Sequence, residues 1–133
     1  MSSETDPFAF GAPVPPPVDD RPVNPVEVEQ ALRRLVNEIA TSVRTVSDTL
    51  DNYRKAEREY DLAFARAYNR HGGAAHAKKY VAEELTQDER AARDNAEVVW
   101  RYASTRARSL ETELTAWQSI AKSVNGMYGA AGG

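Results

Sequence analysis

All seven prolines of the chain lie within its first 25 residues. Proline lacks a backbone N–H and clashes with the preceding helical turn, so a long stretch without it is free to form continuous helix. Glycine, the next strongest helix breaker, interrupts residues 26–125 only at Gly72 and Gly73. The sequence therefore predicts a disordered, proline-rich N-terminal arm over residues 1–24, a helical body over residues 25–125 and a flexible tail over residues 126–133.

The first helix has clear start signals. Asn24 suits the N-cap, Pro25 suits the first helical position, and Glu27 stands where a capping box needs an acid. We expect this helix to cover residues 25–69 and to end at a hinge over residues 70–73, where glycine tolerates the left-handed conformation that closes a helix.

Two more helices are expected after the hinge. A short helix should cover residues 74–85, and a long one should cover residues 87–124. Thr86 and Glu89 match a second capping box, which predicts a break between these helices. Asn125 and Gly126 supply a stop signal after the long helix.

Apolar residues recur every seven positions along the first helix, as in a coiled coil. The predicted seam contains Leu32, Leu35, Ile39, Val46, Tyr53 and Tyr60, with small residues filling several positions between them. A second line, at Val36, Val43, Leu50 and Phe64, broadens the stripe beyond one partner helix. The inward face of the long C-terminal helix is expected to hold Ala92, Ala96, Val99, Ala103, Leu110, Leu114, Trp117, Ile120 and Val124.

These patterns predict an all-α fold, an elongated antiparallel helical hairpin or coiled coil with a short hinge helix. Charged residues make up 28% of the chain, which suits long helices with a narrow core. A narrow core favours a homo-oligomer, and both dimers and tetramers fit the seam. No signal peptide or membrane-spanning run is recognisable, so we expect a cytoplasmic protein without membrane contact.

The net charge of −3 resides in the arm, because the body carries 16 basic and 16 acidic residues. A dedicated nucleic-acid binder usually has a basic excess. The strongest local basic cluster lies around the hinge, where Tyr68 and Tyr80 are interleaved with the cations. The candidate phosphate contacts are Arg66, Arg70, Lys78 and Lys79. The alternative is a solvated basic tip with no ligand.

No sequence motif indicates an enzyme. The chain has no cysteine and no phosphate-binding glycine loop, and its two histidines, His71 and His76, lack a suitably spaced third ligand. We therefore expect no catalytic activity, no metal site and no cofactor.

Other side chains allow two interpretations. The tyrosine stripe at Tyr53, Tyr60 and Tyr68 fits core packing better than base stacking. The arginines Arg101, Arg106 and Arg108 alternate with glutamates and are expected to form surface ion pairs.

The arm offers two candidate partner motifs. Pro15, Pro16 and Pro17 favour the polyproline II conformation that docks in aromatic grooves, and Phe8 and Phe10 present two rings to a partner. The alternative is an inert tether.

The pattern of alanine, arginine and aromatic residues over residues 60–68, 89–94, 101–103 and 114–119 resembles small all-helical proteins encoded by bacteriophages and prophages of actinobacteria. Because such genes often lie near recombination and replication functions, the resemblance implies an accessory role in phage DNA metabolism inside a bacterial host. We therefore expect a non-enzymatic interaction module that self-associates and binds a phage or host protein or single-stranded DNA.

A second resemblance is to the helical-hairpin substrates of type VII secretion. Their Trp-x-Gly turn is absent here, since the hinge contains His71, Gly72 and Gly73. A small structural or secreted hairpin protein without a nucleic-acid role is the alternative function.

Overall fold

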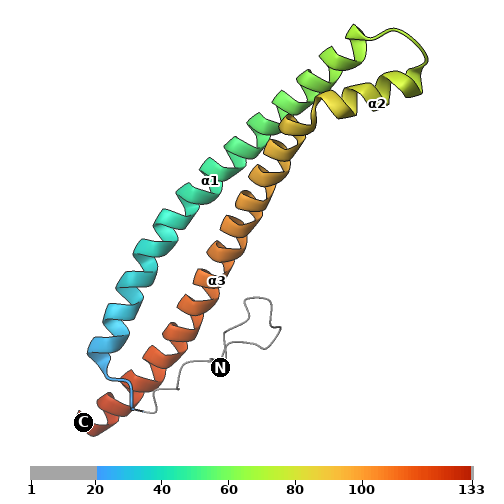
Figure 1. The fold of residues 1–133 in the computed structure, drawn as a ribbon. Helices are drawn as coiled ribbons and strands as arrows, with labels where there is room; N and C mark the ends of the chain where they lie inside the picture. Colours follow the sequence, from blue (N-terminus) through green and yellow to red (C-terminus); the bar gives the residue numbers. More distant parts are fainter. Residues whose placement is uncertain (1–20, 133) are drawn as a thin grey trace, which may run out of the picture.

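The structure is a computed structural model that describes residues 21–132, and every regular element in this range is an α-helix. The predicted all-α class is therefore confirmed. The helices are α1 (Pro25–Arg70), α2 (Ala75–Leu85) and α3 (Gln87–Gly132). Figure 1 shows α1 and α3 side by side in opposite directions, with α2 folded across one end of the pair. At about 1.5 Å per residue, the two long helices each span about 69 Å.

The predicted N-cap of α1 is present at Asn24. The side-chain oxygen of Asn24 accepts a hydrogen bond from the backbone N–H of Glu27 at 2.9 Å, and Pro25 occupies the first helical position. The carboxylate of Glu27 in turn accepts from the side-chain amide of Asn24 at 3.2 Å. Asn24 and Glu27 therefore bond to each other in both directions at the start of α1. The predicted capping box would use the backbone N–H of Asn24 as the donor to Glu27, but the side-chain amide of Asn24 donates instead.

The turn after α1 uses its glycines differently from the expectation. The residue that follows the helix, His71, is extended (φ −103°, ψ 138°), so no left-handed glycine closes α1. The positive φ falls later, at Gly73 (108°), where an L side chain would be strained. Gly73 is thus the residue that lets the chain reverse into α2.

The predicted break between α2 and α3 lies at Thr86, which is buried. Its hydroxyl donates a 2.7 Å hydrogen bond to the carbonyl of Ala82, one turn back in α2. This bond to the preceding helix replaces the predicted capping box with Glu89. A buried hydroxyl needs a partner, and the last turn of α2 supplies a carbonyl within reach.

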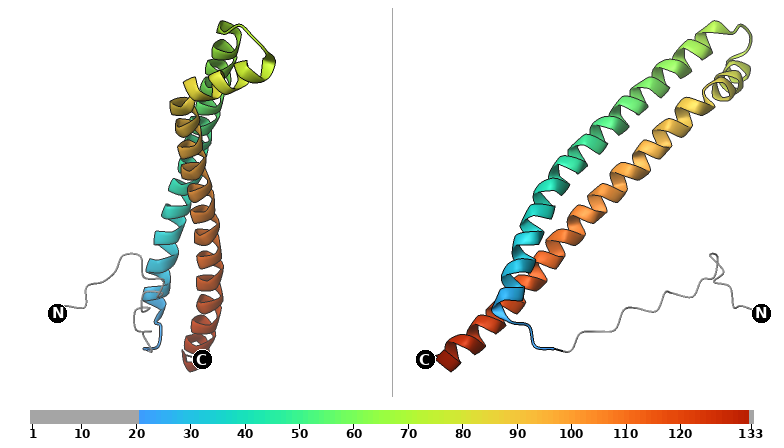
Figure 2. Two further views of the ribbon diagram at one scale, coloured as in Figure 1. Left: turned by 45° about the vertical axis from the view of Figure 1, so that its right-hand side comes forward. Right: turned by 60° about the vertical axis from the view of Figure 1, so that its left-hand side comes forward.

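The end of α3 also differs from the expectation. The predicted end was at residue 124, but α3 continues through Asn125 and Gly126 to Gly132. Figure 2 shows this last part of α3 projecting beyond the start of α1. Each helical glycine costs only about 1 kcal/mol relative to alanine, and no proline blocks the continuation.

The core between the helices is narrow, with few fully buried side chains. The buried apolar residues are Val28, Ala31, Leu35, Ala67, Ala82, Ala103, Leu110 and Val124. Most of the predicted seam is half-buried: Leu32, Ile39, Val46, Tyr53, Tyr60, Leu114 and Trp117. The views in Figure 2 show no third layer over the α1–α3 pair except α2 at one end.

The inward face of α3 follows the prediction at seven of nine positions and departs from it at Ala92 and Val99. Ala92 and Val99 were expected in the core, yet both are exposed, while Trp100 is half-buried against α1. Residues 98–100 are Val-Val-Trp, so more than one face of this turn is apolar. The large indole of Trp100 buries more apolar area than valine does, so Trp100 packs against α1 in place of Val99.

Candidate functional site

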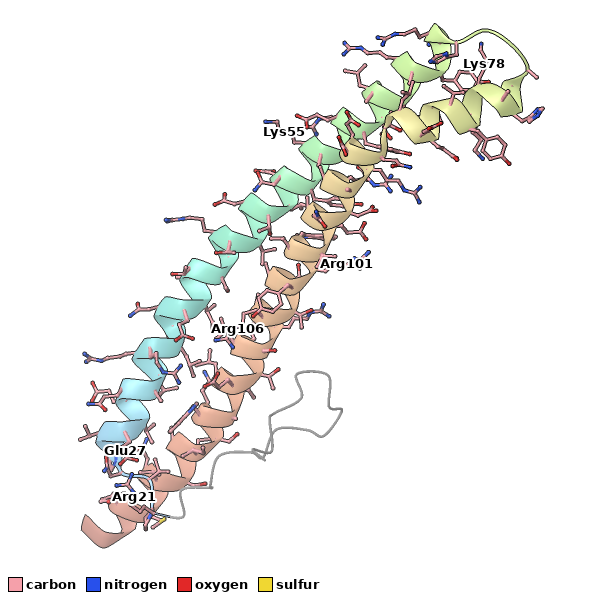
Figure 3. All side chains as sticks on the ribbon, viewed as in Figure 1. Arg21, Glu27, Lys55, Lys78, Arg101 and Arg106 are labelled. Carbon is pink, nitrogen blue, oxygen red and sulfur yellow. The ribbon has the colours of Figure 1, made fainter. Side chains whose placement is uncertain are left out.

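The fold gathers the predicted cations at one end of the rod. Arg66 and Arg70 lie on the last turns of α1, and Lys78 and Lys79 lie on α2. Figure 3 shows α2, on which Lys78 is labelled, folded back beside the end of α1. We call these four residues the basic tip.

Two of the four cations already have partners within the chain. The Lys78 ammonium lies 5.0 Å from the centroid of the Tyr68 ring, as in a cation–π contact. The Lys79 ammonium lies 4.0 Å from the Glu83 carboxylate in an exposed pair. Arg66 and Arg70 are both exposed at the end of α1. The tip therefore offers a phosphate at least two accessible guanidinium groups.

The tyrosine stripe packs inside the chain. Tyr53 stacks on Trp100 of α3, with ring centroids 5.6 Å apart, and the guanidinium of Arg93 lies 4.4 Å from the Tyr60 centroid. Together with the Lys78 contact to Tyr68, these interactions favour the interpretation as helix-packing rings.

The hinge histidines remain separate from each other. His76 makes an edge contact with Tyr80, at 6.5 Å between ring centroids and 87° between planes, while His71 is half-buried after α1. Within residues 21–132, no group of three or more His, Asp or Glu side chains is arranged to hold a metal ion. The arm motifs at Phe8, Phe10, Pro15, Pro16 and Pro17 lie outside the described residues.

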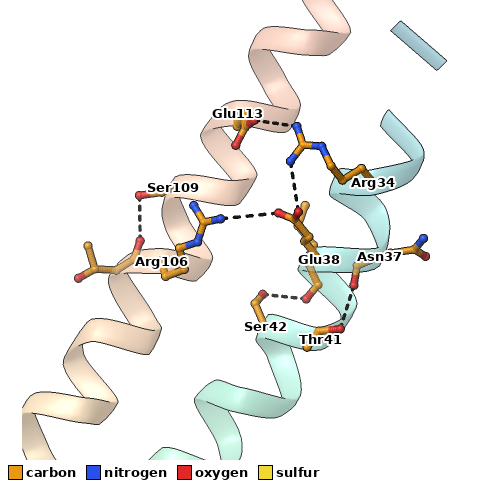
Figure 4. Close-up of polar contacts among 10 residues, drawn as sticks. Arg34, Asn37, Glu38, Thr41, Ser42, Arg106, Ser109 and Glu113 are labelled. Carbon is orange, nitrogen blue, oxygen red and sulfur yellow. Dashed lines mark hydrogen bonds and ion pairs between the residues drawn. The ribbon is translucent and has the colours of Figure 1, made fainter. Parts of the chain in front are cut away.

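A four-residue ion-pair network joins α1 to α3 (Figure 4). Arg34 donates to Glu113 of α3 and to Glu38 of its own helix, both at 3.2 Å, and Arg106 of α3 lies 3.7 Å from the second oxygen of Glu38. The hydrogen bonds to Glu113 and Glu38 raise the pKa of Arg34. Arg106 and Glu113 were expected to pair within one helix, but they bridge the two helices instead.

The expected pairing within α3 is found at Arg101. Its guanidinium donates to Glu97, four residues earlier, at 2.9 Å. This pair is exposed and stabilises one helix only.

Beside this network lies a shallow groove of about 450 Å³ between the two long helices. Its lining comes from both helices: Asn37, Glu38, Thr41, Ser42, Thr45 and Thr49 on α1, and Val99, Tyr102, Ala103, Arg106 and Leu110 on α3. This groove was not predicted from the sequence, because Thr41 and Thr45 lie outside the predicted seam. The spacing of Thr41, Thr45 and Thr49 by four residues was the available signal, since it places three γ-methyl groups in one row on a helix.

The opposite side of α1 carries a second apolar feature. Val36 and Val43 of the predicted broad stripe are 57% and 66% exposed. Within the described chain, no helix covers these two residues, whereas Leu50 and Phe64 of the same stripe are half-buried. The N-terminal half of the stripe is therefore open to solvent.

Among the described residues, no helix is both long and apolar enough to cross a membrane. The chain matches no protein-family model, no curated protein and no solved structure.

Proposed function

We propose that this chain is a non-enzymatic, self-associating interaction module, in which α1 and α3 form a coiled-coil hairpin that binds further helices along its sides. The observation that supports this proposal most directly is the exposure of large apolar side chains on both sides of the rod. Val43 on one side is 66% exposed, and Val99 and Tyr102 on the other are 55% and 73% exposed.

The buried core of the rod is small. Full burial of one valine or leucine side chain contributes roughly 1.5–3 kcal/mol. Of the eight buried apolar residues in the described chain, four are alanine (Ala31, Ala67, Ala82 and Ala103), and two, Val28 and Val124, lie near one end of the rod. A rod of two helices therefore gains much of its apolar stabilisation only when another helix covers its sides. Self-association supplies that cover without a second gene product.

The test is the molar mass of the native chain by light scattering, from about 5 to about 200 µM, a range in which oligomer populations change by mass action. Self-association predicts a multiple of the 14.7 kDa chain mass. A mass of one chain over the whole range would contradict the proposal.

The second candidate function is binding of single-stranded DNA, or of a DNA-processing protein, in phage recombination or replication. The observation that favours it is the basic tip, because α1 and α2 bring Arg66, Arg70, Lys78 and Lys79 to one end of a rod whose other residues carry a net negative charge. Phosphate contacts position a protein on nucleic acid and need no sequence-specific groups. The role in phage DNA metabolism rests on the sequence resemblance.

Fluorescence anisotropy of a labelled single-stranded oligonucleotide tests this candidate at about 50 and about 200 mM salt, where phosphate-driven binding weakens strongly. Replacing the four tip residues by alanine should lower the affinity and flatten its salt dependence. The matched control replaces four exposed cations along the rod: Arg44, Lys55, Arg58 and Arg108.

Equal losses in both variants would mean that the whole surface attracts DNA and not the tip. No binding by the native chain would favour the alternative, a structural or secreted hairpin protein without a nucleic-acid role.

A further inference from the structure

The groove between α1 and α3 has a wall of small residues on α1. Thr41, Thr45 and Thr49 stand one turn apart and form a low ridge along the helix. Each of these hydroxyls donates to a carbonyl of α1 itself: Thr41 to Asn37 at 3.1 Å, Thr45 to Thr41 at 3.2 Å and Thr49 to Thr45 at 2.8 Å.

These internal bonds decide how the wall behaves on burial. A buried hydroxyl without a partner costs about 1–3 kcal/mol, but these three donors are already satisfied. Ser42 behaves in the same way, donating to the carbonyl of Ile39 at 2.7 Å. The wall can therefore leave water without leaving a hydroxyl donor unpaired, and its methyl groups gain contact with whatever covers it.

The opposite wall of the groove carries protruding side chains. Val99 and Tyr102 of α3 line the groove and are 55% and 73% exposed. Exposed aromatic side chains at the centre of an apolar surface are the typical anchors of protein interfaces. The groove thus places two large side chains on α3 next to a ridge of small ones on α1.

The apolar surface continues along α3 beyond the groove. Positions spaced alternately by three and four residues share this side of the helix and are mostly small or apolar: Ala92, Asn95, Val99, Tyr102, Arg106, Ser109, Glu113, Ala116 and Ile120. We call these nine residues the α3 line. Its two charged members, Arg106 and Glu113, are tied to α1 by the pairs with Glu38 and Arg34.

The size of this surface is suited to a dimer. The α3 line covers 29 residues, or about 43 Å, and the whole α1 wall of the groove, residues 37–49, adds about 20 Å of a second helix. With helices about 10 Å wide, the two faces present about 600 Å² in projection. Stable interfaces begin at roughly 600 Å² per partner, so the face reaches the lower end of that class.

We infer that a second copy of this chain covers the groove and the α3 line, so that two hairpins form a two-fold symmetric dimer through this side. In a two-fold interface, residue i of one copy meets residue j of the other and the reverse contact also forms. The groove meets that requirement because it is lined by both large Tyr102 and small Thr45, so each copy offers both the anchor and its receiving wall. This inference rests on the proposed self-association and assigns it to one face.

Sedimentation velocity of surface variants tests the assignment. Tyr102→Arg and Thr45→Lys each place a charge in the groove, and both should weaken dimerisation at least tenfold, which corresponds to about 1.4 kcal/mol. The matched controls are Thr105→Arg on α3 and Ser47→Lys on α1. They add the same charges at exposed positions outside the groove and should keep the native dissociation constant. Circular dichroism should show native helicity in all four, since each replaced residue is exposed.

The outcomes separate this inference from the general proposal. If the native chain associates and both groove variants associate equally well, another face forms the contact, and only the inference fails. If the native chain is monomeric, both fail. A chain lacking residues 1–20 should dimerise with the same dissociation constant as the full chain. If the removal of these residues lowers the dissociation constant tenfold or more, the arm competes with the second copy, and the groove is assigned to the arm instead.

Discussion

Tyr53 of α1 and Trp100 of α3 stack across the helix pair, with ring centroids 5.6 Å apart and ring planes inclined by 12°. This contact joins two long helices midway along the rod, where the buried core contains no large side chain. Arg101 adds its guanidinium at 5.7 Å from the Trp100 centroid. The stack therefore fixes the register between α1 and α3 where small side chains leave it weakly specified.

A double-mutant cycle should reveal this stack as a coupling energy. We expect Tyr53→Leu and Trp100→Leu to be less destabilising together than the sum of the two, by about 0.5–1.5 kcal/mol, because each single change already removes the ring contact. Urea unfolding followed by circular dichroism measures the three free energies. The same cycle between Tyr53 and Trp117, whose ring makes no stack with it, should show additivity, and equal coupling in both cycles would argue against the stack.

The stack also makes the unfolding free energy depend on alkaline pH. Partial burial raises the pKa of the Tyr53 phenol, and the nearby carboxylates of Glu57 and Glu97 raise it further. The folded chain thus holds the proton more tightly than the unfolded chain, in which the phenol titrates near pH 10. This contribution to stability is complete below about pH 10 and is lost as the pH rises through the higher folded pKa.

The check compares urea midpoints of the native chain and Tyr53→Phe at about pH 9 and about pH 11. The native midpoint should fall more than that of the variant, which has no phenol to ionise at this position. Parallel falls in the two chains would contradict the raised pKa.

Glu38 lies between Arg34 and Arg106, so its charge links two helices. We expect Glu38→Gln to lower the free energy of unfolding by about 0.2–1 kcal/mol, in the range of exposed ion pairs, and to do so less in high salt. Glu29→Gln is the matched control, because Glu29 pairs with Arg33 within α1 only. An equal loss in both variants would mean that the link across the helices adds nothing to an ordinary surface pair.

The cap of α1 gives a prediction about the start of the fold. Asn24→Ala removes the acceptor of the Glu27 N–H bond and should cost about 1 kcal/mol, whereas Asn24→Asp keeps an acceptor and should cost much less. Urea unfolding of the two variants provides the comparison. Equal stability of native, Ala and Asp chains would show that the first turn is frayed.

The sequence predicted the features that depend on local chemistry. Asn24 and Pro25 fixed the start of α1 because a cap involves only neighbouring residues, and the break at Thr86 was recognisable for the same reason. The end of α3 was missed because Asn125 and Gly126 are only weak stop signals, which a helix crosses at small cost.

The departure of α3 from its predicted inward face near Val99 depends on tertiary competition. Val99 and Trp100 are both apolar, and only the packing partner Tyr53 decides which one faces α1. The groove was hidden for a related reason. The threonine hydroxyls of α1 bond to their own helix, so Thr45 presents a methyl group to its surroundings. In a sequence pattern, threonine counts as a polar residue, so this apolar surface is not visible there.

The basic tip was predicted residue by residue, since a charge cluster is visible in sequence. Its internal partners were not, because the contact between Lys78 and Tyr68 requires α2 to fold back on α1.

The most direct test of the account is whether the stability of the helices depends on protein concentration. Because association stabilises the folded chain by mass action, we predict that the urea midpoint rises by on the order of 1 M between about 2 and about 200 µM protein. The measurement is circular dichroism of the helical signal, with path lengths matched to concentration. An identical midpoint at both concentrations would show that the single hairpin is stable alone, and it would contradict the claim that its exposed apolar sides are covered by another copy.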